Sequence, residues 1–275
     1  MARILAISSQ VVRGSVGLSI IVPALQALGH EVLALPTVLL SNHPGHAHTA
    51  GTRINTATLT QMLDALAANG WLDRLDGVLT GYLPTLEHVA FAREAVNQTR
   101  AANPACNYLC DPVMGDDPKG LYIEEAVASA IRDTLVPLAG IITPNRFEAS
   151  YLSGRNVGSA ADVTAPFGRT IIATSIPGAR NGHTLNVLVT LARSATTTVP
   201  LREDAPHGTG DLFAALYLGR YLAGRDHVDA LTFATAGVDA TLAASTGSDQ
   251  LSLNALMTHP PEWVNWPLDN SRTIS

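Results

Sequence analysis

The stretch "APHGTGDLFAAL" at residues 205–216 combines a glycine turn, one carboxylate and a run of small apolar residues. Gly208 and Gly210 enclose Thr209, and Asp211 follows directly. Such a turn leaves backbone N–H groups free at the start of a helix, where they bind an anion such as phosphate. A carboxylate repels phosphate, so Asp211 either caps the helix or accepts a proton. A lone glycine turn is weak evidence, and the rest of the chain has to decide.

The chain before this stretch alternates short apolar runs with helical segments. The predicted strands are "RILAIS" (3–8), "VLALPTV" (32–38), "GVLTGYL" (77–83), "NYLCDPV" (107–113), "GIITPN" (140–145), "TIIATSI" (170–176) and "NVLVTLA" (186–192). Helices are expected at 17–28, 56–68, 86–102 and 124–135, and almost throughout 206–246. The sequence therefore predicts an α/β fold with a central, mainly parallel sheet and helices on both faces.

The chain shows no linker-like change of composition and no repeat, so a single domain over 1–275 is expected. One segment departs from the alternation. Residues 156–169, "NVGSAADVTAPFGR", are too few for a full crossover helix, and Pro166 and Gly168 interrupt them. A short or distorted helix is expected there.

Composition argues against several classes of partner, although a local basic site stays open. The net charge is −6 and no dense Lys/Arg run occurs, which argues against nucleic acid and anionic membranes. No run of about 18 apolar residues is present, so no membrane span is expected. The first residues, "MARILAISSQ", predict a strand and not a signal peptide. Cys106 and Cys110 are expected to be reduced thiols of a buried strand, and the protein to be cytoplasmic.

Polar residues follow the ends of most predicted strands, which is where ligands bind in parallel α/β sheets. These residues are Ser9, "SNHPGH" (41–46), Gly81, Tyr82, "DPVMGD" (111–116), "TPNRFE" (143–148), Thr174, Ser175 and 208–211. The first strand is not followed by G-x-G-x-x-G, and no G-x-x-x-x-G-K-[ST] occurs. Phosphate binding therefore has to rest on the turn at 208–210.

Several of these residues have two interpretations. Asn145 and Glu148 either hold a hydrated cation or form a helix capping box, and their spacing alone favours the box. Asp111 and Asp116 either bind Mg²⁺ or are ordinary turn residues. The histidines at 43, 46 and 48 lack the cysteine or carboxylate partners of a closed zinc site.

Six segments together resemble one family. They are "SSQVVRGSVG", "PTVLLSNHPGH", "LTGYL", "DPVMGDDPKGLY", "PLAGIITPNRFEASYLSGR" and "HGTGDLFAAL". In this order, over about residues 4–245, they resemble the pyridoxal kinases of the ribokinase-like superfamily. The resemblance implies a ribokinase-like fold and ATP-dependent phosphorylation of the 5′-hydroxymethyl group of pyridoxal, and of pyridoxine or pyridoxamine.

The resemblance also implies a role for each candidate residue. Asp211 would accept the alcohol proton, and the N–H groups of Gly208, Thr209 and Gly210 would stabilise the transferred phosphoryl group. The substrate would contact Ser9, Val16, Leu40, Pro44, Tyr82, Tyr122 and His207; ATP would contact Asp111, Asn145, Glu148, Thr174 and Ser175; Mg²⁺ would be held by Asp116 and Glu148. The segment "GDDPKGLY" would form a mobile flap. The family also implies a homodimer and leaves open whether a monovalent cation assists.

Three features depart from the family pattern: Pro44 where threonine is usual, His207 where a small apolar residue is usual, and the short segment 156–169. None affects Asp211 or its glycines. Two alternatives stay open on substrate grounds. One is a kinase of hydroxymethylpyrimidine or another heteroaromatic alcohol, and the other is a non-catalytic vitamin B6 or nucleotide binding protein.

Overall fold

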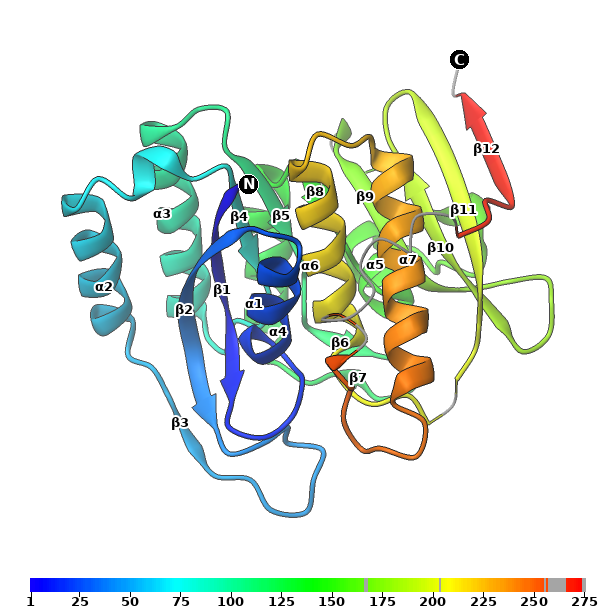
Figure 1. The fold of residues 1–275 in the computed structure, drawn as a ribbon, viewed down its shortest axis with the longest axis horizontal. Helices are drawn as coiled ribbons and strands as arrows, with labels where there is room; N and C mark the ends of the chain where they lie inside the picture. The colour runs from blue at the N-terminus through cyan, green and yellow to red at the C-terminus, as the bar shows by residue number, and fades with distance from the viewer. Residues whose placement is uncertain (166–167, 203, 255, 257–265, 274–275) are drawn as a thin grey trace.

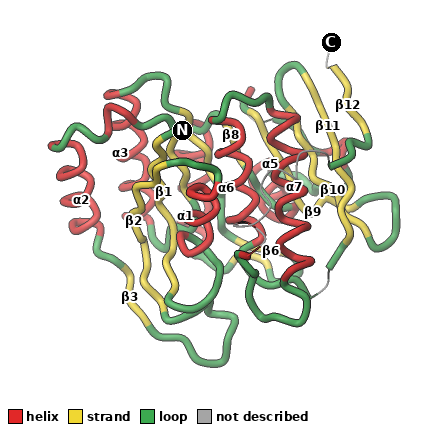
Figure 2. The backbone as a smooth tube through the Cα atoms, viewed as in Figure 1, coloured by secondary structure: helices red, strands yellow, loops and turns green. Residues whose placement is uncertain are grey.

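The central feature is a ten-stranded sheet in the order β12-β11-β10-β9-β8-β5-β4-β1-β2-β3 (Figures 1 and 2). The computed structural model describes residues 1–275 except 166–167, 203, 255, 257–265 and 274–275. The strands are β1 Arg3–Val11, β2 Glu31–Leu40, β3 Gly51–Arg53, β4 Gly77–Thr80, β5 Asn107–Cys110, β8 Ile141–Ile142, β9 Thr170–Pro177, β10 His183–Val189, β11 Arg193–Pro200 and β12 Asn270–Thr273. Strands β2, β1, β4, β5, β8 and β9 pair in parallel, which confirms the mainly parallel sheet.

Each face of this sheet is covered by its own helices. On one face lie α1 (Leu18–Ala27), α6 (Thr209–Leu222) and α7 (His227–Ala244), in front of the sheet in Figure 1. On the other lie α2 (Thr56–Ala68), α3 (Leu86–Ala102), α4 (Glu125–Ala130) and α5 (Arg146–Ser153). Because strand side chains alternate between faces, continuously apolar strands supply both cores.

Strand β1 shows this division directly. Leu5 and Ile7 join the core under α2, α3 and α4, whereas Ile4 and Ala6 join the core under α1, α6 and α7. All four side chains are fully buried. The continuous run "RILAIS" is therefore explained by two apolar faces and not by one.

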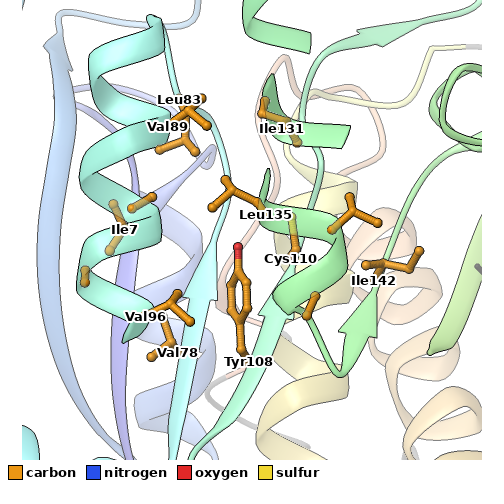
Figure 3. Packing of buried hydrophobic residues seen from close by; sticks show 14 of the residues in the cluster. Ile7, Val78, Leu83, Val89, Val96, Tyr108, Cys110, Ile131, Leu135 and Ile142 are labelled. Carbon is orange, nitrogen blue, oxygen red and sulfur yellow. The ribbon is translucent and has the colours of Figure 1, made fainter. Parts of the chain in front are cut away.

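The core under α3 also accommodates polar atoms (Figure 3). Tyr108 lies among the apolar side chains of β1, β4 and α3, and its hydroxyl shares a 2.8 Å hydrogen bond with Thr80 Oγ1. Cys106 and Cys110 are both free and buried, as expected. Burial raises the pKa of Cys110 to about 12 and that of Cys106 to about 11, so both thiols stay protonated.

The helix predictions hold with small changes. Helices α2 and α3 have the predicted bounds, and α2 begins where Asn55 Oδ1 accepts the Ala57 N–H at 2.8 Å. Helix α4 ends earlier than expected and continues as a π-helical turn over Ile131–Leu135. Among its described residues, the segment 156–169 forms a 3₁₀ turn at Ala160–Asp162, so the expected short helix is confirmed. None of the helices described is long and apolar enough to cross a membrane.

The antiparallel end of the sheet was not predicted. β10 turns back against β9, and β11 and β12 continue in antiparallel pairing. The tail from Pro260 onward was expected to pack along the surface; its residues 260–265 lie outside the described part. From Trp266 the tail is bound to the sheet, because the Trp266 indole N–H donates to Thr198 O at 3.2 Å and β12 follows.

Candidate active site

The turn before α6 has the geometry of an anion site. Gly208 adopts φ 104° and is the N-cap of α6, with no side chain capping the helix. A Cβ on Gly208 would lie 1.9 Å from Ser15 O, so only glycine fits. The helical hydrogen bonds begin with Leu212 N–H donating to Gly208 O. The N–H groups of Thr209, Gly210 and Asp211 therefore have no partner within the helix.

Asp211 is held beside this turn by the other end of the chain. Its Oδ2 accepts the Gly17 N–H at 2.9 Å. Gly17 adopts φ 55°, and a Cβ there would lie 2.2 Å from Ser9 Oγ. On the other side, a Cβ on Gly81 would lie 3.7 Å from Asp211 Oδ1. Glycine on both sides thus leaves space around this carboxylate.

Burial raises the pKa of Asp211 to about 6, and the Gly17 hydrogen bond partly opposes the shift. The group is half-buried and stays largely ionised at pH 7. A carboxylate with a pKa near the working pH is suited to accept a proton.

Asp111 is a buried carboxylate at the same edge of the sheet. It follows β5, and Thr143 Oγ1 donates to its Oδ1 at 3.0 Å. Burial raises the pKa of Asp111 well above its usual value, and the negative charges of Glu148 and Asp211 raise it further. The three carboxylates are thus close enough to repel one another, and a cation would relieve that repulsion.

Asn145 and Glu148 form the capping box that their spacing favoured. Asn145 Oδ1 accepts the Glu148 N–H at 2.9 Å, and Glu148 Oε2 accepts the Asn145 N–H at 2.8 Å. Glu148 Oε1 also accepts the Met114 N–H at 3.0 Å. Burial raises the pKa of Glu148 to about 8 despite these hydrogen bonds, and the charge of Asp116 contributes.

The flap, residues 115–122, forms the hairpin β6 (Gly115–Asp116) and β7 (Gly120–Leu121). Asn145 Nδ2 donates to Gly115 O at 2.8 Å, which ties the flap to α5. Tyr122 follows the hairpin and is 49% exposed. Burial of its hydroxyl raises the pKa of Tyr122, and so do the charges of four carboxylates: Glu148, Asp111, Asp116 and Asp211. Tyr122 is therefore near enough to the acidic site to feel its charge, and its closing over the site stays a prediction.

Asp116 in the flap bears on the metal prediction. Its Oδ1 is buried and has no hydrogen-bond partner among the described residues. A buried carboxylate oxygen without a hydrogen-bond partner is energetically costly unless a bound ion or ligand contacts it. Within the same described part of the chain, however, no three histidine, cysteine or acidic side chains are grouped closely enough to bind a metal by themselves. The residues thus fit a metal ion held mostly by phosphate and water, as Mg²⁺ is.

The predicted substrate residues surround Asp211 from two sides. Ser9 lies against Gly17, and Val16 Cγ1 lies 3.3 Å from the position of a Cβ on Gly208. Tyr82 follows Gly81 and is half-buried, and its N–H donates to Ser8 Oγ at 3.1 Å. These contacts place Ser9 beside Gly17 and Val16 beside Gly208, and Tyr82 directly after Gly81, the glycine next to the Asp211 carboxylate.

The loop after β2 contacts this site where its His43 packs against His207, the residue before the glycine turn. The rings of His43 and His207 stack with centroids 3.8 Å apart. His43 Nδ1 accepts the Gly45 N–H at 3.0 Å, so this nitrogen carries no proton. Burial lowers the pKa of His43 to about 4, with the charges of His207, Lys119 and His46 contributing. Leu40 at the end of β2 is half-buried, and Pro44 is exposed.

A cavity of about 160 Å³ opens on the other side of the turn. Its wall includes the predicted residues Thr174, Ser175, Thr209 and Gly210, which the structure therefore brings together. The pairing of β9 with β10 shifts between Leu185 and Val187, which leaves a bulge at Thr174 and Ser175. Ser175 adopts φ 59°, which is unusual for a residue other than glycine.

Sequence analysis missed the rest of this wall. The missed polar residues are Thr184, Asn186, Arg202, Thr235 and Asp239, and the missed apolar residues include Val199, Phe213, Val238 and Leu242. The available signal was weak: isolated polar residues inside the apolar strand β10 and along α7. They could be assigned to one wall only with the pairing of β9, β10 and β11 known.

A mainly parallel sheet, a glycine turn opening α6 and a half-buried aspartate beside it define a ribokinase-like phosphotransferase. The family model described as phosphomethylpyrimidine kinase matches residues 17–254. A pyridoxal kinase of Corynebacterium diphtheriae is 34% identical over 240 residues, covering 83% of this chain and 84% of that protein. The human pyridoxal kinase is 36% identical over 238 residues, covering 78% of this chain and 76% of that protein.

Solved structures agree with this result. The pyridoxal kinase of Leishmania donovani in complex with ADP and pyridoxine has a TM-score of 0.87 at 28% identity, covering 99% of both chains. The chain therefore belongs to the family of pyridoxal and phosphomethylpyrimidine kinases. It is a phosphotransferase, and the family resemblance drawn from its motifs is confirmed.

Proposed function

We propose that this protein phosphorylates the 5′-hydroxymethyl group of pyridoxal, and of related vitamers, with ATP. The observation that carries the proposal is the position of Asp211, whose carboxylate lies between the glycine turn and Gly81 with its pKa raised to about 6. The relatives support these substrates. The Leishmania donovani protein binds ADP and pyridoxine, and that protein, the Corynebacterium diphtheriae protein and the human protein are all named pyridoxal kinases.

In the proposed reaction Asp211 Oδ1 accepts the proton of the substrate hydroxyl. The substrate oxygen then forms a bond to the γ-phosphorus, the bond between that phosphorus and the bridging oxygen of ADP breaks, and its electron pair leaves with ADP. The N–H groups of Gly208, Thr209 and Gly210 stabilise the negative charge of the transferred group. Asp211 Oδ2 keeps its hydrogen bond to Gly17, which fixes the direction of the reacting oxygen.

Asp116 and Glu148 would hold Mg²⁺, and Asp111 adds negative charge beside them. The supporting observations are the partnerless Oδ1 of Asp116 and the raised pKa of Glu148. When bound, Mg²⁺ would neutralise part of the negative charge of the phosphates. Because both Glu148 oxygens already accept backbone N–H groups, we infer that Glu148 acts mainly through its charge or through metal-bound water.

The vitamer would lie between Tyr82 on one side and Val16 with His207 on the other. Ser9 would bond to the pyridine ring, and Leu40 and Pro44 would border it from the loop after β2. Tyr122 would close over the site and exclude water, which its nearness to the four carboxylates supports. On the other side of the turn, Asn145, Thr174 and Ser175 would contact the nucleotide phosphates.

The test is ADP release by the purified protein with ATP and Mg²⁺. Pyridoxal, pyridoxine, pyridoxamine and hydroxymethylpyrimidine are compared, with Asp211→Asn as the matched control. We expect turnover of at least one vitamer, and a kcat lower by about two to four orders of magnitude in Asp211→Asn at nearly unchanged ligand affinity. Near wild-type turnover by Asp211→Asn would exclude this residue as the base.

A second candidate function is phosphorylation of hydroxymethylpyrimidine. The description of the matching family model, phosphomethylpyrimidine kinase, favours it. It would show as a kcat/KM for hydroxymethylpyrimidine above that for every vitamer. Binding of a vitamer without ADP release from any of the four alcohols would instead support a non-catalytic binding protein.

The remaining expectations stay predictions. They are one domain over 1–275, a homodimer, a cytoplasmic location and an open question of monovalent cation dependence. Sedimentation of the purified protein measures whether it is a homodimer. The ADP-release assay with Na⁺ replaced by K⁺ measures whether activity depends on a monovalent cation.

A further inference from the structure

The ion pair between Arg202 and Asp239 lies in the wall of the 160 Å³ cavity beside the glycine turn. Arg202 precedes the turn, and Asp239 lies one helical turn after Thr235 on α7, which lines the same cavity. No feature of the catalytic step requires this pair. Its position nevertheless places two charged groups where a nucleotide bound at Thr174 and Ser175 would extend.

This pair differs from the ion pairs on the surface. The side chains of Arg202 and Asp239 are 34% and 25% exposed, compared with 54% and 53% for Arg13 and Asp249. Exposed pairs contribute little to stability, and partial burial adds a desolvation cost. Stability alone therefore does not account for charges placed inside a cavity wall.

The pair also leaves part of its hydrogen-bonding capacity unused. Arg202 Nη2 donates to Asp239 Oδ1 at 2.8 Å, and this is the one hydrogen bond between them. Arg202 Nε is buried without a partner in the part of the chain that the structure describes. By contrast, Arg220 engages both carboxylate oxygens of Asp229, which lies on the same helix α7. Among the described residues Asp239 Oδ2 has no hydrogen-bond donor, and since Arg202 Nε is enclosed, a donor to a ligand beside it has to come from an Nη of the same guanidinium.

An acceptor next to a donor matches the edge of adenine. Adenine presents its N6 amino group, a donor, beside the ring acceptor N7, whereas guanine presents two acceptors, O6 and N7. Guanine O6 would face the Asp239 carboxylate and be repelled. The apolar residues Val199, Val238 and Leu242 in the same wall suit the flat faces of a purine ring.

We propose that Asp239 reads the base of the nucleoside triphosphate and selects ATP over GTP. In this arrangement Asp239 Oδ2 accepts the N6 amino proton, and Arg202 is a positioning residue that orients the carboxylate and offers a donor to the ring nitrogen. The inference rests on the proposed kinase reaction, because it names the nucleotide specificity of the same site.

The test compares Asp239→Asn with the wild type in kinase assays and in equilibrium binding of ADP and GDP. The amide offers a donor to guanine O6, so we expect the ratio of kcat/KM for ATP to that for GTP to fall about tenfold or more. The ADP to GDP affinity ratio should fall equally, and the KM for pyridoxal should stay unchanged. Asp229→Asn is the control, since it makes the same substitution in another arginine–aspartate pair on α7 whose aspartate does not line this cavity, and its ratios should equal those of the wild type.

If the ratio of kcat/KM for ATP to kcat/KM for GTP in Asp239→Asn stays within twofold of the wild-type ratio, the inference is overturned. If Asp239→Asn does not fold, the double variant Arg202→Met with Asp239→Leu removes both charges, and the same loss of discrimination is expected from it. The binding arm separates the two proposals. If the wild type shows no turnover but Asp239→Asn has a changed ratio of ADP affinity to GDP affinity, the proposed function is refuted and the role of Asp239 in base selection is supported.

Discussion

Replacing Gly208 by alanine tests whether the glycine turn has to be in its observed position. The new Cβ would lie 1.9 Å from Ser15 O, whereas a carbon–oxygen contact is normally about 3.3 Å, so the turn has to move by about 1.4 Å. A displacement of about 1 Å in a catalytic group costs about 100-fold in rate. We therefore expect kcat to fall about 100-fold, which corresponds to about 2.7 kcal/mol in the activation free energy.

The backbone angle of Gly208 adds a cost to folding. A residue with a Cβ at φ 104° is strained, and such strain costs about 1–3 kcal/mol. The free energy of unfolding of Gly208→Ala should therefore fall by about that amount in urea titrations. The ADP-release assay at saturating ATP and pyridoxal measures kcat on the folded protein.

Gly210→Ala is the matched control within the same turn. A Cβ on Gly210 would meet no atom within 4 Å, and Gly210 lies in the first turn of α6. Alanine should leave the unfolding free energy unchanged or raise it by up to about 1 kcal/mol. Because Gly210 lines the cavity, the added methyl should instead raise the KM for ATP. Equal kcat values for Gly208→Ala and the wild type would refute the argument that the turn cannot move.

Three further predictions follow from single residues. With the pKa of Asp211 near 6, the base is ionised only above that pH, so kcat/KM should rise with pH through about 6; a flat profile from pH 5 to 8 would contradict the assignment. Pro44→Thr should lower the KM for pyridoxal by supplying a hydroxyl and an N–H, whereas an unchanged or higher KM would mean that the loop depends on another contact, such as the His43–His207 stack. Ser175→Gly should raise the unfolding free energy by about 1 kcal/mol in urea titrations, because glycine tolerates φ 59°, and should raise the KM for ATP if the hydroxyl contacts phosphate.

Local signals in the sequence predicted the elements whose ends are defined by local chemistry. Asn55 caps α2 through its own side chain, and Gly70, just after this helix, adopts φ 68°. Both signals act over a few residues, so the bounds of α2 could be read directly. Strand β11 carried no such signal: its centre is "ATTT", and the burial of Thr197 depends on α7, since its hydroxyl meets that of Thr235 at 3.2 Å.

The same distinction applies to the site. Residues directly after strand ends, such as Asp111 and Thr174, were predictable because parallel strands bring their carboxyl ends to one edge. Asn186 and Asp239 could not be found in this way. One lies inside an antiparallel strand and the other in the second half of a helix, so their shared cavity depends on tertiary packing.

The hydrogen bond from Gly17 to Asp211 has a consequence for synthesis of the protein. It joins residues 194 positions apart, and Arg13 pairs with Asp249 across 236 positions. Contacts of such high sequence separation form late in folding, because the entropy of closing the long loop opposes them. A ribosome-bound chain that has produced only the six parallel strands does not yet contain Asp211, the proposed base. On the proposed mechanism, phosphotransfer can therefore begin only after α6 has docked beside the start of α1, and activity reports completion of the whole fold.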